Sequence, residues 1–575
     1  MKKLLSLMLV LSMALALCVP AWADESHTIT GEEFPIYAGG QDTGGKIPLY
    51  FLDGVTDLPY MEAGKLCEWL DGFFGSKELG VSFTMETEGP VVTYTRHHEG
   101  SPSDGVYATF DFDKSEIVFL DYNLFVMKAD ASTVLDMTSK TFFNDQGEPA
   151  VLQKINKGTF DRYGDELVLP LAEYGIELVY QPIENGLYLI PLQTISDFIF
   201  ATGRGYNLYF NGQGVFVGQK ILPGDEAYYA APTGERSEAL TQYGYGELCM
   251  MLDYLYGQKE IHEIDSFDQL FQQVVFDQIL KGPEVVQADG AIYRLLTDFL
   301  DDGHSGWHAF SYLSGDIDFT APYGASMTRL SDQRTMYYKA RMKAFPDGVP
   351  GYQEIGNTAY ITFDEFAFGN EISLEDFYLV NDPADFADTD TIGLIMKAHA
   401  MITRENSPIE NVVLDLSCNG GGSVDTAVFV IAWFLGEANI GMKDTMTGAV
   451  CASTYRCDAS RDREFDERDT VEDKNLFVLT SPFSFSCGNL VPCALKDSGK
   501  VTVLGRTSGG GSCVVLDISS AWGTSFQISG TQRLSFIKNG AYYDIDRGAD
   551  PDFVITSPEK FYDREALTDY INSLY

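Results

Sequence analysis

The last third of the chain alternates apolar strands with helices, and this alternation limits the fold more than any other feature. The run "NVVLDLS" (411–417) is almost continuously apolar, as expected for a strand of a parallel sheet covered on both faces. A glycine turn and an apolar helix follow at 418–436, and a second strand and helix fill 475–499. A third strand and a second glycine turn fill 500–511. Repeated strand–turn–helix units predict an α/β core.

The rest of the chain divides into segments of different periodicity. Residues 24–220 carry short runs of alternating apolar and polar residues, which predict small α+β modules, two of them if a break falls near 130–150. Between 225 and 310, apolar residues recur three and four positions apart, which predicts a helical segment ending at the loop "DDGHS". We therefore assign 311–575 to the α/β core.

The first 23 residues have the pattern of a secretory signal peptide. Lys2 and Lys3 give a basic start, 4–19 is apolar, and "AWA" at 21–23 offers small residues for cleavage. The apolar run is short for a membrane anchor, and acidic sequence follows at once. We expect cleavage after residue 23, a protein secreted to the exterior of the cell envelope, and no membrane span after cleavage.

The charge of the chain excludes one class of partner. The net charge is −45, and removing residues 1–23 takes away two lysines and no acidic residue, which makes it −47. A protein this acidic repels the phosphates of nucleic acids, so we expect no nucleic-acid partner.

The cysteines suggest no metal site. The chain has nine cysteines, and cleavage of the signal peptide removes Cys18. A lipid anchor on Cys18 is disfavoured, because such a signal needs a small residue where the bulky Leu17 stands. No CxxC or Cys/His spacing indicates zinc. Export permits disulfides, and Cys451/Cys457 and Cys487/Cys493 are conceivable pairs.

Three features lie where parallel strands end, which is where ligands and reactive groups gather in open sheets. They are the glycines 420–422, Ser486 in "SFSCGN", and the glycines 509–511. Ser486 falls at a strand-to-helix turn, where the Cys487 amide suits an oxyanion. Gly421 could supply a second amide, because a glycine lets the backbone approach closely. Neither glycine turn continues into Gly-Lys-Ser/Thr, which disfavours a phosphate-binding loop.

A serine hydroxyl needs a base before it acts as a nucleophile. His304 in "DDGHS" follows Gly303 at a predicted helix break and is the candidate. A metal site with His308 would want glutamate where Ser305 stands, so we expect no metal and no cofactor. A thiol nucleophile at Cys487 is the rival, although small buried cysteines are commoner.

Four stretches together resemble one enzyme family. "VVLDLSCNGGGSVDTAV", "FVLTSPFSFSCGN", "VTVLGRTSGGGS" and "GADPDFVI" occur in the order and spacing of the S41 serine peptidases, the C-terminal processing and tricorn-type enzymes. The resemblance covers about 290–560. It implies that Ser486 is the nucleophile and that the core is a ClpP/crotonase-like spiral of β-β-α units. The N-terminal modules are similar to those of some secreted Gram-positive enzymes.

The resemblance also implies the base and the acid. One branch of the family uses a lysine at the position of Gly511, and this chain has none there. The tricorn-like branch uses a histidine in an Asp-x-His-Ser/Thr context, which implies His304. An acid near Gly-x-x-Pro-Asp orients that histidine, and Asp546 is favoured over Asp544. Alternation along a strand would put both on one face.

The chain departs from the family pattern at three positions beside the site. Ser417 replaces an arginine, Cys487 an alanine and Asn489 a glutamate. Asn489 is expected on the first helical turn after Ser486, where it could contact substrate together with Gly420 and Gly422.

The leading hypothesis is a secreted serine endopeptidase or carboxyl-terminal processing peptidase that hydrolyses peptide bonds through an acyl-enzyme. Its partner is a peptide or protein substrate. The alternative is a catalytically inactive module of the same fold that binds peptide or cell-wall ligands. The sequence predicts neither the substrate preference nor the oligomeric state.

Overall fold

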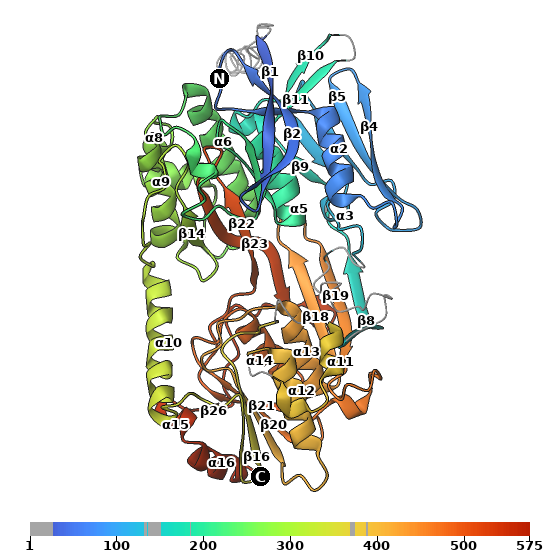
Figure 1. The fold of residues 1–575 in the computed structure, drawn as a ribbon, viewed down its shortest axis with the longest axis vertical. Helices are drawn as coiled ribbons and strands as arrows, with labels where there is room; N and C mark the ends of the chain where they lie inside the picture. The colour runs from blue at the N-terminus through green and yellow to red at the C-terminus, as the bar shows by residue number, and fades with distance from the viewer. Residues whose placement is uncertain (1–26, 132–134, 136–150, 184–185, 369–373, 387–388) are drawn as a thin grey trace, which may run out of the picture.

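The computed structural model describes residues 27–131, 135, 151–183, 186–368, 374–386 and 389–575. The expected signal peptide and most of the expected break near 130–150 lie outside them. Figure 1 shows two lobes stacked along the long axis, with the N-terminal strands and the green helices in one and the C-terminal core in the other.

The N-terminal lobe interleaves two sheets rather than placing one after the other. A seven-stranded sheet has the order β10-β11-β3-β2-β1-β13-β12, so it takes strands from both ends of 24–220. β1 and β13 pair in parallel, with Tyr37 opposite Phe216. A five-stranded sheet, β4-β5-β6-β7-β9, comes from the segment between. The strands are β1 (Ile29–Ala38), β2 (Gln41–Leu52), β3 (Tyr60–Glu62), β4 (Val81–Glu88), β5 (Val91–His98), β6 (Tyr107–Asp111), β7 (Glu116–Phe119), β9 (Leu167–Leu169), β10 (Val179–Gln181), β11 (Leu187–Pro191), β12 (Asn207–Phe210) and β13 (Val215–Gly218).

Helices complete this lobe. α2 (Ala63–Phe74) packs on β4 and β11, and the segment expected to be helical forms α6 to α9 and the π-helical turn η5. η5 ends at Asp301, whose φ of 36° is left-handed and turns the chain into the "DDGHS" loop. The helices are α3 (Tyr122–Phe125), α4 (Leu192–Ile195), η3 (Ser196–Ala201), α5 (Thr202–Arg204), α6 (Glu238–Leu255), α7 (Phe267–Gln273), α8 (Phe276–Leu280), α9 (Val285–Arg294) and η5 (Leu295–Leu300).

The C-terminal lobe is built on a six-stranded sheet, β15-β16-β17-β20-β21-β26, which is parallel from β16 to β26. Its strands are β15 (Tyr352–Ile355), β16 (Thr358–Thr362), β17 (Asn411–Asp415), β20 (Asn475–Thr480), β21 (Val501–Gly505) and β26 (Phe553–Val554). Val412 and Leu414 pack with α12 (Thr391–Thr403), α13 (Val424–Leu435) and α14 (Cys487–Asp497), whereas Val413 packs with Phe561 and the C-terminal helices α15 (Glu559–Tyr562) and α16 (Arg564–Asn572). Burial on both faces explains the continuous apolar run, and the predicted α/β core is confirmed.

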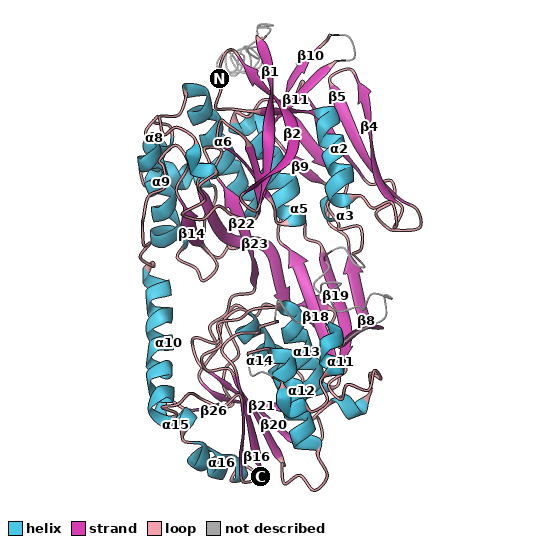
Figure 2. Ribbon diagram, in the orientation of Figure 1, coloured by secondary structure: helices cyan, strands magenta, loops and turns pink. Residues whose placement is uncertain are grey.

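A third sheet joins the lobes. Its order is β14-β23-β18-β19-β8, and β22 also pairs with β23 (Figure 2). β14 (Gly306–Ala309) comes from the end of the helical segment and β8 (Leu152–Arg162) from the N-terminal lobe. The others come from the core: β18 (Ala438–Asp444), β19 (Val450–Cys457), β22 (Cys513–Ser519) and β23 (Ser525–Ser535). Pairing of Trp307 with Phe526 brings the loop before β14 to the core.

A long helix, α10 (Ala325–Ala344), lies along one side and bridges the lobes (Figure 1). Its buried residues are only Tyr337, Ala340 and Arg341, so it has no apolar stripe for the sequence to reveal. The remaining elements are α11 (Leu374–Leu379), β24 (Ile537–Lys538), β25 (Ala541–Tyr542) and the short 3-10 helices η2 (Leu171–Tyr174), η4 (Tyr228–Ala230), η6 (Pro383–Asp385) and η7 (Glu467–Asp469). Among the described helices, none combines the length and the apolar character needed to cross a bilayer.

The disulfides considered from the sequence are absent. None of the eight described cysteines is disulfide-bonded. Cys451 and Cys457 lie on one extended strand, and six residues at about 3.3 Å each exceed the reach of a disulfide. Cys487 and Cys493 both lie on α14 and are likewise unbridged.

Candidate active site

Ser486 lies at the turn between β20 and α14 in a strained backbone conformation. Its φ of 56° and ψ of −124° are rare for a residue with a side chain. The strain is held by the Ser486 N–H, which donates to Gly510 O at 2.9 Å. A serine at a strained strand-to-helix turn presents its hydroxyl outward, as a nucleophile requires.

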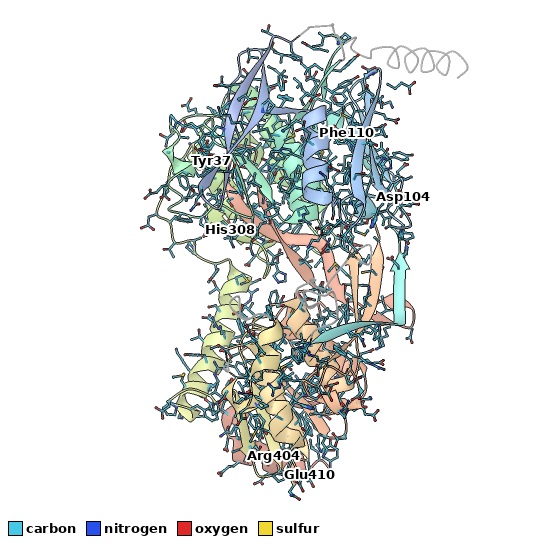
Figure 3. All side chains as sticks on the ribbon, turned by 45° about the vertical axis from the view of Figure 1, so that its right-hand side comes forward. Tyr37, Asp104, Phe110, His308, Arg404 and Glu410 are labelled. Atoms are coloured by element: carbon cyan, nitrogen blue, oxygen red, sulfur yellow. The ribbon has the colours of Figure 1, made fainter. Side chains whose placement is uncertain are left out.

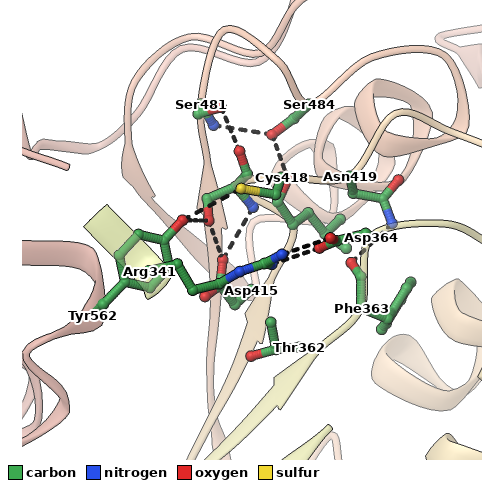
Figure 4. A network of polar contacts seen from close by, with 12 residues as sticks. Arg341, Thr362, Phe363, Asp364, Asp415, Cys418, Asn419, Ser481, Ser484 and Tyr562 are labelled. Carbon is green, nitrogen blue, oxygen red and sulfur yellow. Dashed lines mark hydrogen bonds and ion pairs between the residues drawn. The ribbon is translucent and has the colours of Figure 1, made fainter. Parts of the chain in front are cut away.

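Hydrogen bonds from two serines fix this turn to the end of β17. Ser481 Oγ donates to Ser417 O at 2.6 Å, and Ser484 Oγ donates to Leu416 O at 2.7 Å (Figure 4). Both hydroxyls are buried. The turn before Ser486 is therefore rigid and in register with the glycine turn that follows β17.

The glycine turn lies directly against Ser486. A Cβ on Gly421 would be 2.7 Å from Ser486 Cβ, so only glycine fits there. The Gly421 N–H, expected to bind an oxyanion, instead donates to Asn419 Oδ1 at 2.9 Å. Among the described residues, the N–H groups of Cys487 and Gly422 have no acceptor. Cys487 directly follows Ser486, and its Sγ contacts Gly422 O, so both amides lie near this turn and are free to donate.

His304 is held by the turn that Asp302 organises. Asp302 Oδ1 accepts the N–H groups of His304 and Ser305 at 2.9 and 2.8 Å. The imidazole is buried, and burial lowers its pKa, against the opposing charges of Asp302 and Asp546. Its Nδ1 is buried with no hydrogen-bond partner among the described residues. His304 is thus neutral at neutral pH and can accept a proton.

Phe485 connects His304 to the serine turn. The two ring centroids are 4.9 Å apart. The ring of Phe485 fills a slot between two glycines: a Cβ on Gly303 would overlap it, and a Cβ on Gly511 would lie 2.5 Å from its Cζ. Gly511 is the position where one branch of the resembled family carries lysine, and Phe485 occupies that space. Phe485 was not predicted as a site residue, because nothing local in the sequence indicates its long-range partners.

No hydrogen bond joins Ser486 and His304 in the part of the chain that the structure describes, and the imidazole contacts Phe485, the residue before Ser486. The hydrogen-bond geometry expected between base and hydroxyl is often looser without substrate.

The two predicted acids bind elsewhere. Arg533 Nη2 forms an ion pair with Asp546 Oδ2 and lies 3.1 Å from Asp544 Oδ2. Asp546 Oδ1 accepts the Ser512 N–H at 2.7 Å. The expectation that either carboxylate orients His304 by a hydrogen bond is thus not met, because a guanidinium on β23 takes both. Asp546 still acts on His304 through its charge.

Asn489 is a structural residue and does not face substrate as expected. Its side chain is fully buried, with Nδ2 donating to Ile545 O at 3.0 Å and Oδ1 accepting from Ser508 Oγ at 2.7 Å. Ser508 Oγ in turn accepts the Ala549 N–H at 2.7 Å. The expected substrate contacts Gly420 and Gly422 are both exposed.

Ser417 stands where the resembled family has an arginine, and here arginines from two helices lie near that position instead. Arg564 Nη2 on α16 lies 2.6 Å from Asp415 Oδ2, and both side chains are buried. Ser417 Oγ donates to Asp415 Oδ1 at 2.6 Å. Arg341 on α10 holds Asp364 through two bonds of 2.6 Å beside the same turn (Figure 4).

The rival nucleophile is disfavoured. Cys487 Sγ donates to Gly422 O at 3.2 Å, and burial, with a smaller contribution from Asp425, raises the pKa of the thiol to about 12. A thiol in that environment is not a thiolate at neutral pH.

His308, considered with His304 as a metal ligand, pairs with a carboxylate of its own. His308 Nε2 lies 2.8 Å from Asp517 Oδ1 on β22, at the lower edge of the N-terminal lobe (Figure 3). Elsewhere, Asp458, Asp462 and Asp469 bring carboxylate oxygens within 4.8 Å of one another. Asp462 is already paired with Arg468 at 2.6 Å, and burial raises the pKa of Asp469 to about 6.

Comparison with known proteins gives one family match. Residues 357–555 match the model of peptidase family S41. The match includes Ser486, Gly421 and Asp546, but it begins at residue 357 and therefore excludes His304. A search of curated proteins found no match.

Several solved structures are similar. The photosystem II D1 C-terminal processing protease is 18% identical over 35% of this chain and 43% of its own length, with a TM-score of 0.26. A putative peptidase from Parabacteroides merdae is 16% identical over 56% and 93%, with a TM-score of 0.39. The tricorn protease is 10% identical over 92% and 62%, with a TM-score of 0.31.

Proposed function

Because the chain belongs to peptidase family S41 through residues 357–555, and members of that family are serine-type peptidases, we propose that it hydrolyses peptide bonds with Ser486 as nucleophile. The observation that carries this proposal is the strained backbone of Ser486 beside the unbonded Cys487 N–H. A turn of that kind stores strain, and strain of this sort gathers at functional sites.

The residues around Ser486 suit each step of acyl transfer. Ser486 Oγ attacks the scissile carbonyl carbon, and its proton passes to His304. The N–H groups of Cys487 and Gly422 bind the tetrahedral oxyanion, a contribution worth about 10²–10³ in rate for one donor. His304 then returns the proton to the leaving amine, and water hydrolyses the acyl-enzyme by the same transfers.

Two carboxylates assist His304 through their charge. Burial keeps the imidazole neutral at rest, which suits a base. Once it takes the proton, the negative charges of Asp302 and Asp546 stabilise the imidazolium. Phe485 is a positioning residue, because its ring holds the imidazole from the side of Ser486.

We also propose that the protein is secreted, as residues 1–23 predict. It would then act outside the cell as an endopeptidase or as a carboxyl-terminal processing peptidase. Intact mass of the mature protein tests secretion, since cleavage after residue 23 leaves Asp24 first.

Labelling with a fluorophosphonate tests the function. The wild-type protein should gain one adduct, located on Ser486 by peptide mapping, and Ser486→Ala should gain none. Full labelling of Ser486→Ala would refute the nucleophile.

One observation favours the alternative of an inactive binding module. Arg533 holds both predicted acids, and no described residue is bonded to His304 Nδ1. A folded wild-type protein that binds peptide but is inert to the fluorophosphonate would establish that alternative.

A further inference from the structure

Two arginines without an acidic partner lie beside the glycine turn of the site. Arg334 on α10 is exposed, and Arg506 follows β21 and is half-buried. Within the described part of the chain, neither forms an ion pair, whereas Arg341 on the same helix pairs with Asp364. The chain has 84 acidic residues against 39 basic ones, so acidic partners are abundant.

These arginines are connected to the site by direct contacts. The Arg334 guanidinium lies 5.4 Å from the ring centroid of Phe483, and a Cβ on Gly420 would be 3.3 Å from that ring. Arg506 Nη1 lies 3.5 Å from the side-chain oxygen of Gln333, the residue before Arg334. We call Arg334, Phe483 and Arg506 the arginine shelf.

The shelf is continuous with the surface that substrate must cover. Gly420 and Gly422 are exposed, and Gly421 between them touches Ser486. A peptide whose scissile carbonyl lies at Ser486 extends in two directions from it. The part of the peptide that runs past Gly420 reaches the arginine shelf.

The chemistry of the shelf selects one kind of group. A guanidinium binds a carboxylate through two parallel hydrogen bonds, and an aromatic ring beneath it limits the orientations it adopts. Positive charge at a site in an otherwise acidic protein also draws anionic groups toward that site. The acidic residue of α10, Asp332, forms no ion pair in the described structure and leaves both arginines available.

We propose that the arginine shelf binds the carboxylate of an acidic side chain of the peptide substrate. This inference rests on the proposed function, since it names the substrate class of the same site. It predicts selectivity for acidic peptides by a protein whose net charge would otherwise repel them.

The test measures how peptides protect Ser486 from fluorophosphonate labelling. The probes are an N-acetylated alanine heptapeptide and seven variants with one glutamate each, all as C-terminal acid and as C-terminal amide. The measured quantity is the peptide concentration that halves the labelling rate. The proteins are wild type, the double variant Arg334→Gln/Arg506→Gln, and the control Lys339→Gln, an exposed lysine elsewhere on α10.

We expect at least one carboxylate-bearing peptide to protect about tenfold better than its neutral counterpart, the gain that a charge-assisted hydrogen bond provides. The double variant should lose this advantage, and Lys339→Gln should keep it. An advantage that depends on the position of glutamate and persists in the C-terminal amides supports the proposal, whereas one that disappears in every amide comes from the C-terminus and would overturn it.

Equal protection by acidic and neutral peptides would overturn the proposal for the arginine shelf. So would better protection by acidic peptides that persists in the double variant. Failure of the proposed function is distinguishable, because the wild-type protein would then not be labelled at all. In that case, calorimetric titration with the same peptides decides the inference, again by comparison of wild type with the double variant.

Discussion

The imidazole of His304 stacks obliquely on the ring of Phe485, with centroids 4.9 Å apart and planes inclined by 54°. The contact depends on pairing of β14 with β23, which carries the loop of the helical segment to the α/β core. It also depends on two glycines that leave room for the ring. An aromatic residue next to Ser486 thus fixes the position of His304.

Ser486→Ala and His304→Ala should each lower kcat/KM for peptide hydrolysis by at least about 10⁴-fold, because the acyl-enzyme needs both the hydroxyl and the base. The assay is cleavage of a fluorogenic peptide together with circular dichroism to verify folding. Ser557→Ala, at a half-buried serine ahead of α15 whose hydroxyl bonds Glu559, is the matched control and should retain wild-type activity. Wild-type turnover by either site variant would contradict the assignment.

Phe485→Ala should move the acid limb of the kcat/KM–pH profile to higher pH. Burial lowers the pKa of His304, and removing the ring admits water, so the pKa rises toward its ordinary value and the base is protonated at a higher pH. Phe561→Ala is the control for loss of an aromatic side chain, since Phe561 is buried on the opposite face of the sheet. An acid limb that stays in place in Phe485→Ala, as it should in the control, would show that the ring has only a packing role.

Arg564→Met should lower the free energy of unfolding by about 3–5 kcal/mol, because it leaves the Asp415 carboxylate buried without its guanidinium. Urea denaturation measures the loss. Adding Asp415→Asn to Arg564→Met should recover part of it, since the unpaired charge is then gone. No recovery in the double variant would mean that packing of Arg564, rather than its charge, supplies the stability.

The N-terminal lobe should lose stability as pH rises from about 5 to 8. Asp197 and Glu247 are buried beside each other, and Asp197 Oδ2 and Glu247 Oε1 have no other donor among the described residues. Burial raises the pKa of Glu247 to about 7 and that of Asp197 well above its ordinary value. A raised pKa in the folded state gives stability that is complete below the unfolded pKa, near 4.5, and is lost as pH rises through the folded one.

The measurement for this pair is the melting temperature against pH, by calorimetry. Asp197→Asn keeps the shape of the side chain but removes one ionisable group, so its melting temperature should fall less between pH 5 and 8. A parallel fall in the variant and the wild type would locate the pH dependence elsewhere.

Much of the core was predictable because its signals are local. The apolar run at 411–417 contains β17, and the turn after "NLFVLTS" begins α14 at Cys487, one residue after Ser486. Strand burial and glycine turns act over a few residues, so a single sequence reveals them.

The partners of the site residues were not predictable in the same way. Asp546 was expected on His304, yet Arg533 binds it, and Asn489 was expected at the substrate, yet it holds Ser508. These pairings arise from the meeting of distant strands and loops. α10 was missed for a related reason: it bridges two lobes with only three buried residues, and so lacks an amphipathic period.

The sheet that joins the lobes determines how short a fragment of this protein can be and still contain the complete candidate site. Cutting the chain at the limits of the family match, 357–555, would keep the serine but discard β14, β8 and the histidine carried ahead of β14. Such a fragment would also leave the β14 side of β23 and the β8 side of β19 unpaired, and bare strand edges invite aggregation. Recombinant tests of the proposed activity therefore have to begin upstream of residue 357 and keep the N-terminal lobe.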